Sequence, residues 1–295
     1  MDKNIFNIKG SLISFQNTIG YHLDGIYYKS YNSKKVIIHI HGSYGNFYHD
    51  KFIKVMAKIY TESGYNFFSF NLTCHDGFSE GYKNKNVFEY IGGAVSDFLT
   101  CISDIEGAIQ FVAKFNEKII LQGHSLGCDR VVYYLLTSGQ KYDFILLGAC
   151  DSCKLHSIWL KSETVEQQIQ RLKLIQYNNL DFDWLPINEY GIYNDKEDYI
   201  LPITRKALLS IISGPPFILF NIDNPIDYFL DLNCFLYIGQ KDKLQTEEPG
   251  IMINFFKARI KHLETFIVKD GDHMMTECEE TVAKKIIEWL NNNNY

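Results

Sequence analysis

The stretch IILQGHSLGCDR, residues 119–130, decides the expected fold because an apolar run passes through a short turn into a helical pattern. Ser125 lies in this turn between Gly123 and Gly127, in the spacing G-x-S-x-G. Small residues suit any tight turn, so Ser125 taken alone is compatible with a turn that carries no chemistry. Between a strand and a helix, however, the same spacing is typical of a nucleophilic serine held on a strained turn. The other segments of the chain have to separate the two interpretations.

Apolar runs of strand length recur along the chain without the alternation of a half-exposed strand. They are residues 34–40, 66–72, 118–123, 143–149, 234–239 and 264–270. Such runs are typical of parallel strands covered on both faces, and helical patterns lie between them. We therefore predict an α/β fold with a doubly wound, mostly parallel sheet. The alternating segments SLISFQ and YHLDGIYYKS predict an antiparallel entry to that sheet.

Residues 151–232 interrupt this rhythm. They contain a charged helical stretch (156–176), an aromatic loop and a second helical pattern (203–213). Unstructured connections of this length are uncommon in compact domains unless they serve a function. We expect a core formed by residues 1–150 and 233–295, and a helical cap or lid formed by residues 151–232. Its aromatic residues could line a substrate site or form the cap's own small core; they are Trp159, Phe182, Trp184, Tyr190, Tyr193, Phe217 and Phe220.

Three loops that follow predicted strands carry the chemistry a serine needs. A serine becomes a good nucleophile when a base takes its proton and a third group orients that base. His273, in VKDGDHMM, follows the last predicted strand, and Asp242, in YIGQKDKL, follows the strand before it. The chain order Ser125, Asp242, His273 is the order found in one class of triad enzymes. Asp151 also follows a strand, so it is the alternative acid.

An earlier loop, in IHIHGSYGN, is suited to stabilise an oxyanion. Here His41 and Gly42 precede Ser43, whose backbone N–H can point at a developing negative charge. The N–H of Leu126, at the start of a helix, is the expected second donor. We expect His41 to support the loop and the glycines Gly42, Gly123 and Gly127 to permit close packing.

Together these motifs resemble the α/β-hydrolase superfamily over nearly the whole chain. The resemblance is carried by HGSYGN, HDGFSEG (75–81), GHSLG, GQKD and GDH, in that order. GHSLGCDRVVYYL and LPITRKALLSII also resemble the DUF1749 (UPF0613) family of hydrolases, some of whose fungal members are linked to the cleavage of siderophore esters. The resemblance implies that Ser125 attacks a carbonyl, His273 transfers the proton and Asp242 stabilises the imidazolium. It implies no metal and no organic cofactor.

Composition limits the partners. Hydrophobic residues make up 46% and charged residues 22% of the chain, which is typical of a globular protein. A net charge of −6 does not favour nucleic acid as a partner. With no membrane span, no signal-peptide pattern and seven scattered cysteines, we expect a cytoplasmic protein with reduced thiols. Cys150 and Cys153 form a lone C-x-x-C, which is too little for a zinc site.

These observations favour a serine hydrolase that cleaves a carboxylic ester of a small or medium-sized molecule. Thioester hydrolysis and acyl transfer would use the same triad. A non-catalytic binding protein with this fold is the opposed interpretation. The substrate and the oligomeric state do not follow from the sequence.

Overall fold

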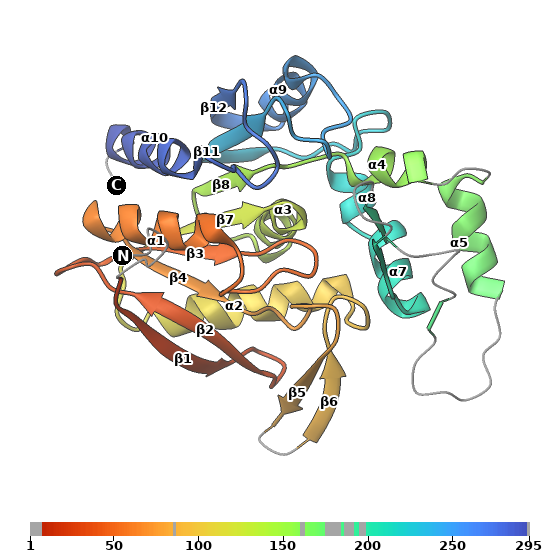
Figure 1. The fold of residues 1–295 in the computed structure, drawn as a ribbon, viewed down its shortest axis with the longest axis horizontal. Coiled ribbons are helices and arrows are strands. Elements are labelled where there is room, and N and C mark those ends of the chain that lie inside the picture. Colours follow the sequence, from red (N-terminus) through yellow and green to blue (C-terminus); the bar gives the residue numbers. More distant parts are fainter. Residues whose placement is uncertain are drawn as a thin grey trace.

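The computed structural model describes residues 8–84, 87–159, 163–174, 184–185, 192–194 and 199–293. Its centre is an eight-stranded sheet with the strand order β1-β2-β4-β3-β7-β8-β11-β12 (Figure 1). These strands are β1 (Gly10–Gln16), β2 (His22–Tyr28), β3 (Lys35–Ile40), β4 (Asn66–Phe70), β7 (Lys118–His124), β8 (Phe144–Leu147), β11 (Leu230–Gly239) and β12 (Ile260–Val268). From β4 to β12 all neighbours pair in parallel, whereas β1 pairs antiparallel with β2, and β2 with β4. The predicted mostly parallel sheet with an antiparallel entry is confirmed.

Helices cover both faces of this sheet, which explains why its strands are apolar throughout. Helices α1 (Lys51–Glu62) and α10 (Glu279–Asn292) pack side by side on one face, in a core that includes Met56, Phe67 and Trp289. The other face carries α2 (Cys101–Val112), α3 (Leu126–Ser138) and α9 (Pro249–Lys257), which bury a second core against the sheet. A short 3₁₀ helix, η1 (Phe98–Thr100), precedes α2. No helix in the described part of the chain is long and apolar enough to cross a bilayer.

The region between β8 and β11 folds into small elements beside the sheet. These are α4 (Ser152–Trp159), α5 (Val165–Leu174), β9 (Ile192–Asn194), β10 (Tyr199–Leu201), α7 (Arg205–Ile212) and α8 (Pro216–Leu219), which Figure 1 shows gathered on one side. The single helical stretch expected over 156–176 is thus two helices. The strand expected from 234 begins earlier, at Leu230.

The aromatic residues of this region divide between two environments. Phe217 packs with the ring of His156 inside a small core formed by the region's own helices. Phe220 lies in the core of the sheet, against Phe256, and Trp184 stays 38% exposed. Phe182 and Tyr190 lie outside the described residues, as do the side chains of Trp159 and Tyr193. The described buried aromatic residues therefore contribute to packing.

A hairpin that the apolar pattern did not predict projects from the molecule. It consists of β5 (Ser79–Lys83) and β6 (Val87–Ile91), paired antiparallel in a sheet of their own (Figure 1). The hairpin residues Tyr82, Val87, Phe88 and Tyr90 are between 43% and 52% exposed. The segment SEGYK contains polar residues and a glycine, so it lacks the apolar pattern from which buried strands are predicted.

Candidate active site

Ser125 occupies a strained position between β7 and α3. Its backbone has φ 55° and ψ −129°, a conformation that side-chain-bearing residues rarely adopt. Its N–H donates to the carbonyl of Leu147, which fixes the turn against the neighbouring strand (2.9 Å). A Cβ on Gly123 would lie 2.4 Å from the carbonyl oxygen of Gly127, and a Cβ on Gly127 would lie 2.2 Å from that of Ile40. The two glycines are therefore needed because backbone segments meet there.

His273 and Asp242 meet beyond the carboxyl ends of β12 and β11. His273 Nδ1 donates to Asp242 Oδ2 at 2.8 Å, and the Asp242 side chain is fully buried. The other carboxylate oxygen of Asp242 accepts the N–H of Leu244 (2.9 Å). Because Nδ1 carries the hydrogen that it donates to the carboxylate, Nε2 is left with its lone pair free to accept a proton. Nε2 is buried and forms no hydrogen bond with any described group.

A third loop, after β3, lies against Ser125. A Cβ on Gly42 would be 2.8 Å from Ser125 Cβ and 3.3 Å from its Oγ, so only glycine fits there. Ser43, which follows, is exposed. Leu126 begins α3, and the first N–H groups of a helix have no partner within it. The residues expected to bind an oxyanion thus border the serine.

Asp151, the alternative acid, has other partners. Its Oδ1 accepts the N–H of Lys154 and its Oδ2 accepts the N–H of Ile222, both at 2.8 Å. Asp151 therefore joins the first and last parts of the region between β8 and β11. His273 contacts Asp242 instead.

The fold of the chain matches that of several solved structures. The chain has the α/β-hydrolase fold. It is similar to Est1E of Butyrivibrio proteoclasticus, solved with ferulic acid bound, with 13% identity and a TM-score of 0.64, over 95% of this chain and 98% of Est1E. Mouse α/β-hydrolase domain-containing protein 10 gives 17% identity and a TM-score of 0.64, over 96% and 99% of the two chains. An esterase of Pyrococcus furiosus gives 13% identity and a TM-score of 0.61, over 97% and 91%.

No protein-family model matches the sequence, and no curated protein matches it. The resemblance to the DUF1749 family stays a prediction.

His124 comes directly before Ser125, at a motif position typical of packing and loop support. Its ring lies between those of Phe52 and His273, with centroids 4.8 and 4.9 Å away. Burial lowers the pKa of His124 to about 3, so the ring is neutral. Its Nε2 lies 2.9 Å from the backbone carbonyl oxygen of His273, and since a carbonyl only accepts, this nitrogen carries the proton. His124 thus holds the loop that carries His273, a partner that the local motif does not identify.

The loop after β4 braces the loop after β3. Asn46 Nδ2 donates to Asp76 Oδ1 (2.7 Å), and the N–H of Phe47 donates to Asn71 Oδ1 (3.1 Å). Asp76 has a positive φ of 51°, and its N–H donates to the carbonyl of Gly45 (3.1 Å). The sequence singled out HDGFSEG, but its contacts with the HGSYGN loop appear only in the fold.

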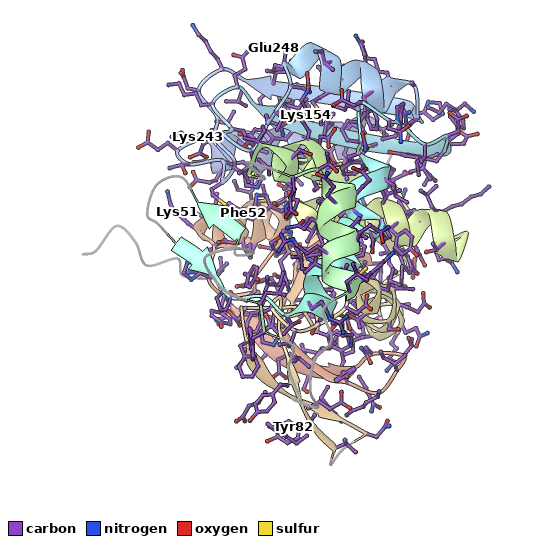
Figure 2. The ribbon with its side chains drawn as sticks, turned by 90° about the vertical axis from the view of Figure 1, so that its right-hand side faces the viewer. Lys51, Phe52, Tyr82, Lys154, Lys243 and Glu248 are labelled. Carbon is purple, nitrogen blue, oxygen red and sulfur yellow. The ribbon has the colours of Figure 1, made fainter. Side chains whose placement is uncertain are left out.

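The region between β8 and β11 is attached to this edge of the sheet. Lys154 pairs with Glu247, in the loop after β11. Figure 2, seen from the side of α5, shows Lys154, Lys243 and Glu248 at one end of the molecule and Tyr82 at the other. The N–H of Thr204 donates to the carbonyl of Ala94 (2.8 Å).

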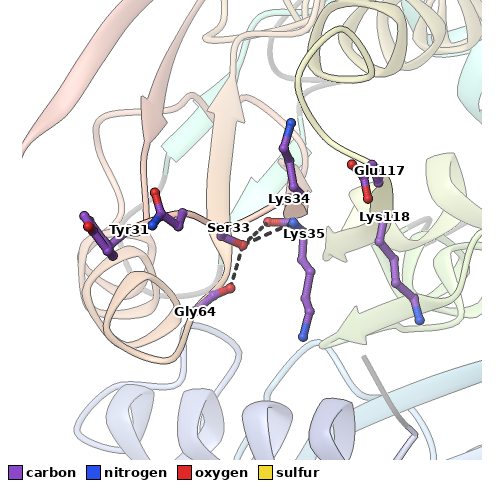
Figure 3. A pocket seen from close by; sticks show the side chains of 8 residues that line it. Tyr31, Ser33, Lys34, Lys35, Gly64, Glu117 and Lys118 are labelled. Carbon is purple, nitrogen blue, oxygen red and sulfur yellow. Dashed lines mark hydrogen bonds between the residues drawn. The ribbon is translucent and has the colours of Figure 1, made fainter.

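A hollow of about 740 Å³ lies at the opposite edge of the sheet (Figure 3). It lies next to the first residues of β3 and β7, and its lining includes Lys34, Lys35 and Lys118. Its Ser33 hydroxyl donates to the carbonyl of Gly64 (2.6 Å), and no basic side chain of the described residues hydrogen-bonds to it. Ligands of doubly wound sheets bind where the strands end, so this hollow is not the candidate active site.

Proposed function

We propose that this protein is a serine hydrolase that cleaves carboxylic esters of small or medium-sized molecules. The observation that carries the proposal is the 2.8 Å hydrogen bond from His273 to the buried Asp242, in the same fold that strains Ser125. A histidine oriented by a buried carboxylate, with a free second nitrogen, is what a serine nucleophile requires. The structural neighbours that share this fold include esterases, which supports the proposal.

In the proposed reaction the Ser125 oxygen forms a bond to the ester carbonyl carbon. Its proton passes to His273 Nε2, and the carbonyl π electrons move onto the oxygen. When these electrons return, the alkoxide leaves and takes the proton from His273, which produces an acyl-enzyme and an alcohol. Water then repeats the sequence and releases the acid and free Ser125. Asp242 stabilises the imidazolium in both halves.

The oxyanion is stabilised in this proposal by the N–H groups of Ser43 and Leu126. Removal of one such donor typically lowers kcat by about 100- to 1000-fold. No metal and no organic cofactor takes part in the proposed steps.

Residues 151–232 serve as the cap in this proposal. Three attachments support that role: Asp151 to both ends of the region, Lys154 to Glu247, and Thr204 to Ala94. All seven cysteines are free thiols, which supports a reducing, cytoplasmic location.

A fluorophosphonate probe tests the nucleophile. We expect it to label the wild-type protein and to leave Ser125→Ala unlabelled, because phosphonylation requires an activated serine. Ser33→Ala is the matched control, because no basic side chain in the described part of the chain hydrogen-bonds to Ser33, and its labelling should equal that of the wild type. Equal labelling of Ser125→Ala would exclude Ser125 as the nucleophile.

The acid is tested by Asp242→Asn and Asp151→Asn. We expect Asp242→Asn to lower kcat by about 10⁴-fold, because an amide no longer stabilises the imidazolium and favours the wrong tautomer of His273. Asp151→Asn should leave kcat within about threefold. The reverse pattern would make Asp151 the triad acid.

A panel of esters and thioesters, graded by acyl length, tests the substrate class. It includes a feruloyl ester, because Est1E was solved with ferulic acid bound. We expect faster turnover of esters than of matched thioesters. Labelled Ser125 without turnover on the whole panel would instead indicate acyl transfer or ligand binding.

A further inference from the structure

The carbonyl oxygen of Gly42 accepts three hydrogen bonds, more than an ordinary loop carbonyl receives. Its donors are His41 Nδ1 at 2.9 Å, Arg130 Nη1 at 3.1 Å and the N–H of Gly45 at 3.4 Å. Arg130 comes from α3, so a helix on one side of Ser125 holds a loop on its other side. The orientation of the Gly42–Ser43 peptide is therefore set by this arginine and histidine.

Peptide geometry transmits that orientation to the N–H of Ser43. Peptide bonds throughout the described residues are trans, and in a planar trans peptide the N–H points away from the C=O. With the Gly42 oxygen held toward Arg130, the Ser43 N–H faces the other way. Within the described chain it donates to no other group, so it is free for a ligand beside Ser125.

Arg130 is suited to polarise this peptide because it is buried and directs its charge at carbonyls. Arg130 is only 3% exposed, and its Nη1 also donates to the carbonyl of His41 (2.7 Å). The guanidinium lies over the ring of Phe98, with Arg130 Cζ 5.7 Å from the ring centroid. Both oxygens of the adjacent Asp129 are buried without a described partner, and burial raises the pKa of this carboxyl well above its usual value. Burial therefore favours the uncharged form of Asp129, and neither of its oxygens is hydrogen-bonded to Arg130.

His41 completes the arrangement as a neutral ring. Its Nε2 accepts the N–H of Leu72 (3.1 Å), which leaves the proton on Nδ1 for the bond to Gly42. Burial, and then the charge of Arg130, lower the pKa of His41 well below its usual value. Hydrogen bonds to a carbonyl strengthen the N–H of the same amide as a donor.

We propose that Arg130 is a positioning residue for the oxyanion hole: it orients and polarises the Gly42–Ser43 peptide so that the Ser43 N–H can bind the oxyanion. This inference rests on the proposed function for its catalytic consequence. The orientation of the peptide itself does not depend on the reaction.

The kinetic test compares Arg130→Met and Arg130→Lys with Arg259→Met. Arg259 is the matched control because it is also buried, donates to the carbonyl of Phe255 (3.0 Å) and packs on an aromatic ring, but lies in the turn between α9 and β12. We expect Arg130→Met to lower kcat by about 100-fold with KM within about threefold, as for loss of one oxyanion donor. Arg130→Lys keeps a cationic donor and should recover at least about tenfold of that loss. Arg259→Met should leave kcat within about threefold.

A second readout separates oxyanion binding from general loss of structure. Each variant is assayed with an aryl ester and the matching thionoester, whose sulfur is a poorer hydrogen-bond acceptor. We expect Arg130→Met to reduce the ester-to-thionoester rate ratio by about tenfold. The reason is that weaker donors in the oxyanion hole stabilise the ester's oxyanion less, while the sulfur of the thionoester depends less on these donors. An unchanged ratio, or an equal loss of kcat in Arg259→Met, would overturn the catalytic part of the inference.

An NMR measurement tests the peptide without any substrate. The chain contains two Gly–Ser pairs, Gly10–Ser11 and Gly42–Ser43, so glycine labelled with ¹³C at the carbonyl and serine labelled with ¹⁵N give two linked signals. Arg130→Met should move the Gly42 carbonyl signal upfield, since that oxygen loses a donor, and leave the Gly10 signal in place. If the Gly42 signal does not move, the inference is wrong. If it moves while the wild type cleaves no ester, the proposed function fails and the positioning by Arg130 stands.

Discussion

At the scale of single residues, the candidate site depends on backbone groups held by buried side chains. His124 and Arg130 both donate to backbone carbonyls, one in the His273 loop and the other in the Gly42 loop. They flank Ser125 in sequence, so the segment that carries the nucleophile also positions the loops on either side of it. This arrangement explains why both side chains are buried although both are polar.

The role of His124 predicts which substitutions the site tolerates. His124→Phe keeps the ring but removes the donor to the His273 carbonyl, and we expect kcat to fall by about 10- to 100-fold because the base is misplaced. His124→Gln carries an amide N–H at a similar reach and should stay within about threefold of wild type. Steady-state kinetics on the best ester would measure both. Similar losses in the two variants would show that the hydrogen bond is not what matters.

At the scale of elements, the region between β8 and β11 is held at its base. The carboxylate of Asp151 receives N–H groups from the beginning of α4 and from the segment after α8. A small core around Leu172, Leu208 and Phe217 then stabilises the helices themselves. The described helices of this region thus share a core of their own, and Asp151, directly after β8, joins its first and last parts.

Removal of the Asp151 carboxylate should lower the free energy of unfolding and leave kcat nearly unchanged. Asp151→Ala leaves two backbone N–H groups without their acceptor, and each costs about 1–3 kcal/mol when it stays buried. We expect a free energy of unfolding lower by about 2–4 kcal/mol in urea titrations, with kcat of the folded protein within about threefold. A loss of kcat at unchanged stability would place Asp151 in the chemistry.

At the scale of the whole molecule, Asp104 connects three parts of the chain. From α2 it accepts hydrogen bonds from Asn17, between β1 and β2, and from the N–H and hydroxyl of Thr73, after β4 (2.6, 2.8 and 2.8 Å). Its burial outweighs these bonds and raises the pKa of the carboxyl to about 6. The folded state therefore holds a proton on Asp104 at pH values where the unfolded chain has released it.

This raised pKa predicts a pH dependence of stability with a definite sign. Between the ordinary pKa of 3.8 and about 6 the folded state binds more protons than the unfolded state, so the stability contributed by Asp104 falls as pH rises. The full effect is about 3 kcal/mol. The advantage of wild type over Asp104→Asn should therefore shrink from about pH 4 to about pH 7 in urea titrations. Asp24→Asn, at an exposed carboxylate, is the control; a constant difference for Asp104→Asn would contradict the prediction.

The sequence by itself determined the strands of the sheet and the loops that carry the candidate residues. Strand runs and turn glycines are local patterns, and parallel strands bring their carboxyl ends to one edge whatever the details of packing. Only the tertiary structure decided that His273 contacts Asp242 rather than Asp151, that Arg130 and His124 hold the flanking loops, and that SEGYK pairs in a hairpin. The Arg130 and His124 contacts join residues 89 and 149 positions apart. The physical reason is that such contacts depend on how helices, loops and sheet pack together, which spacing along the chain does not encode.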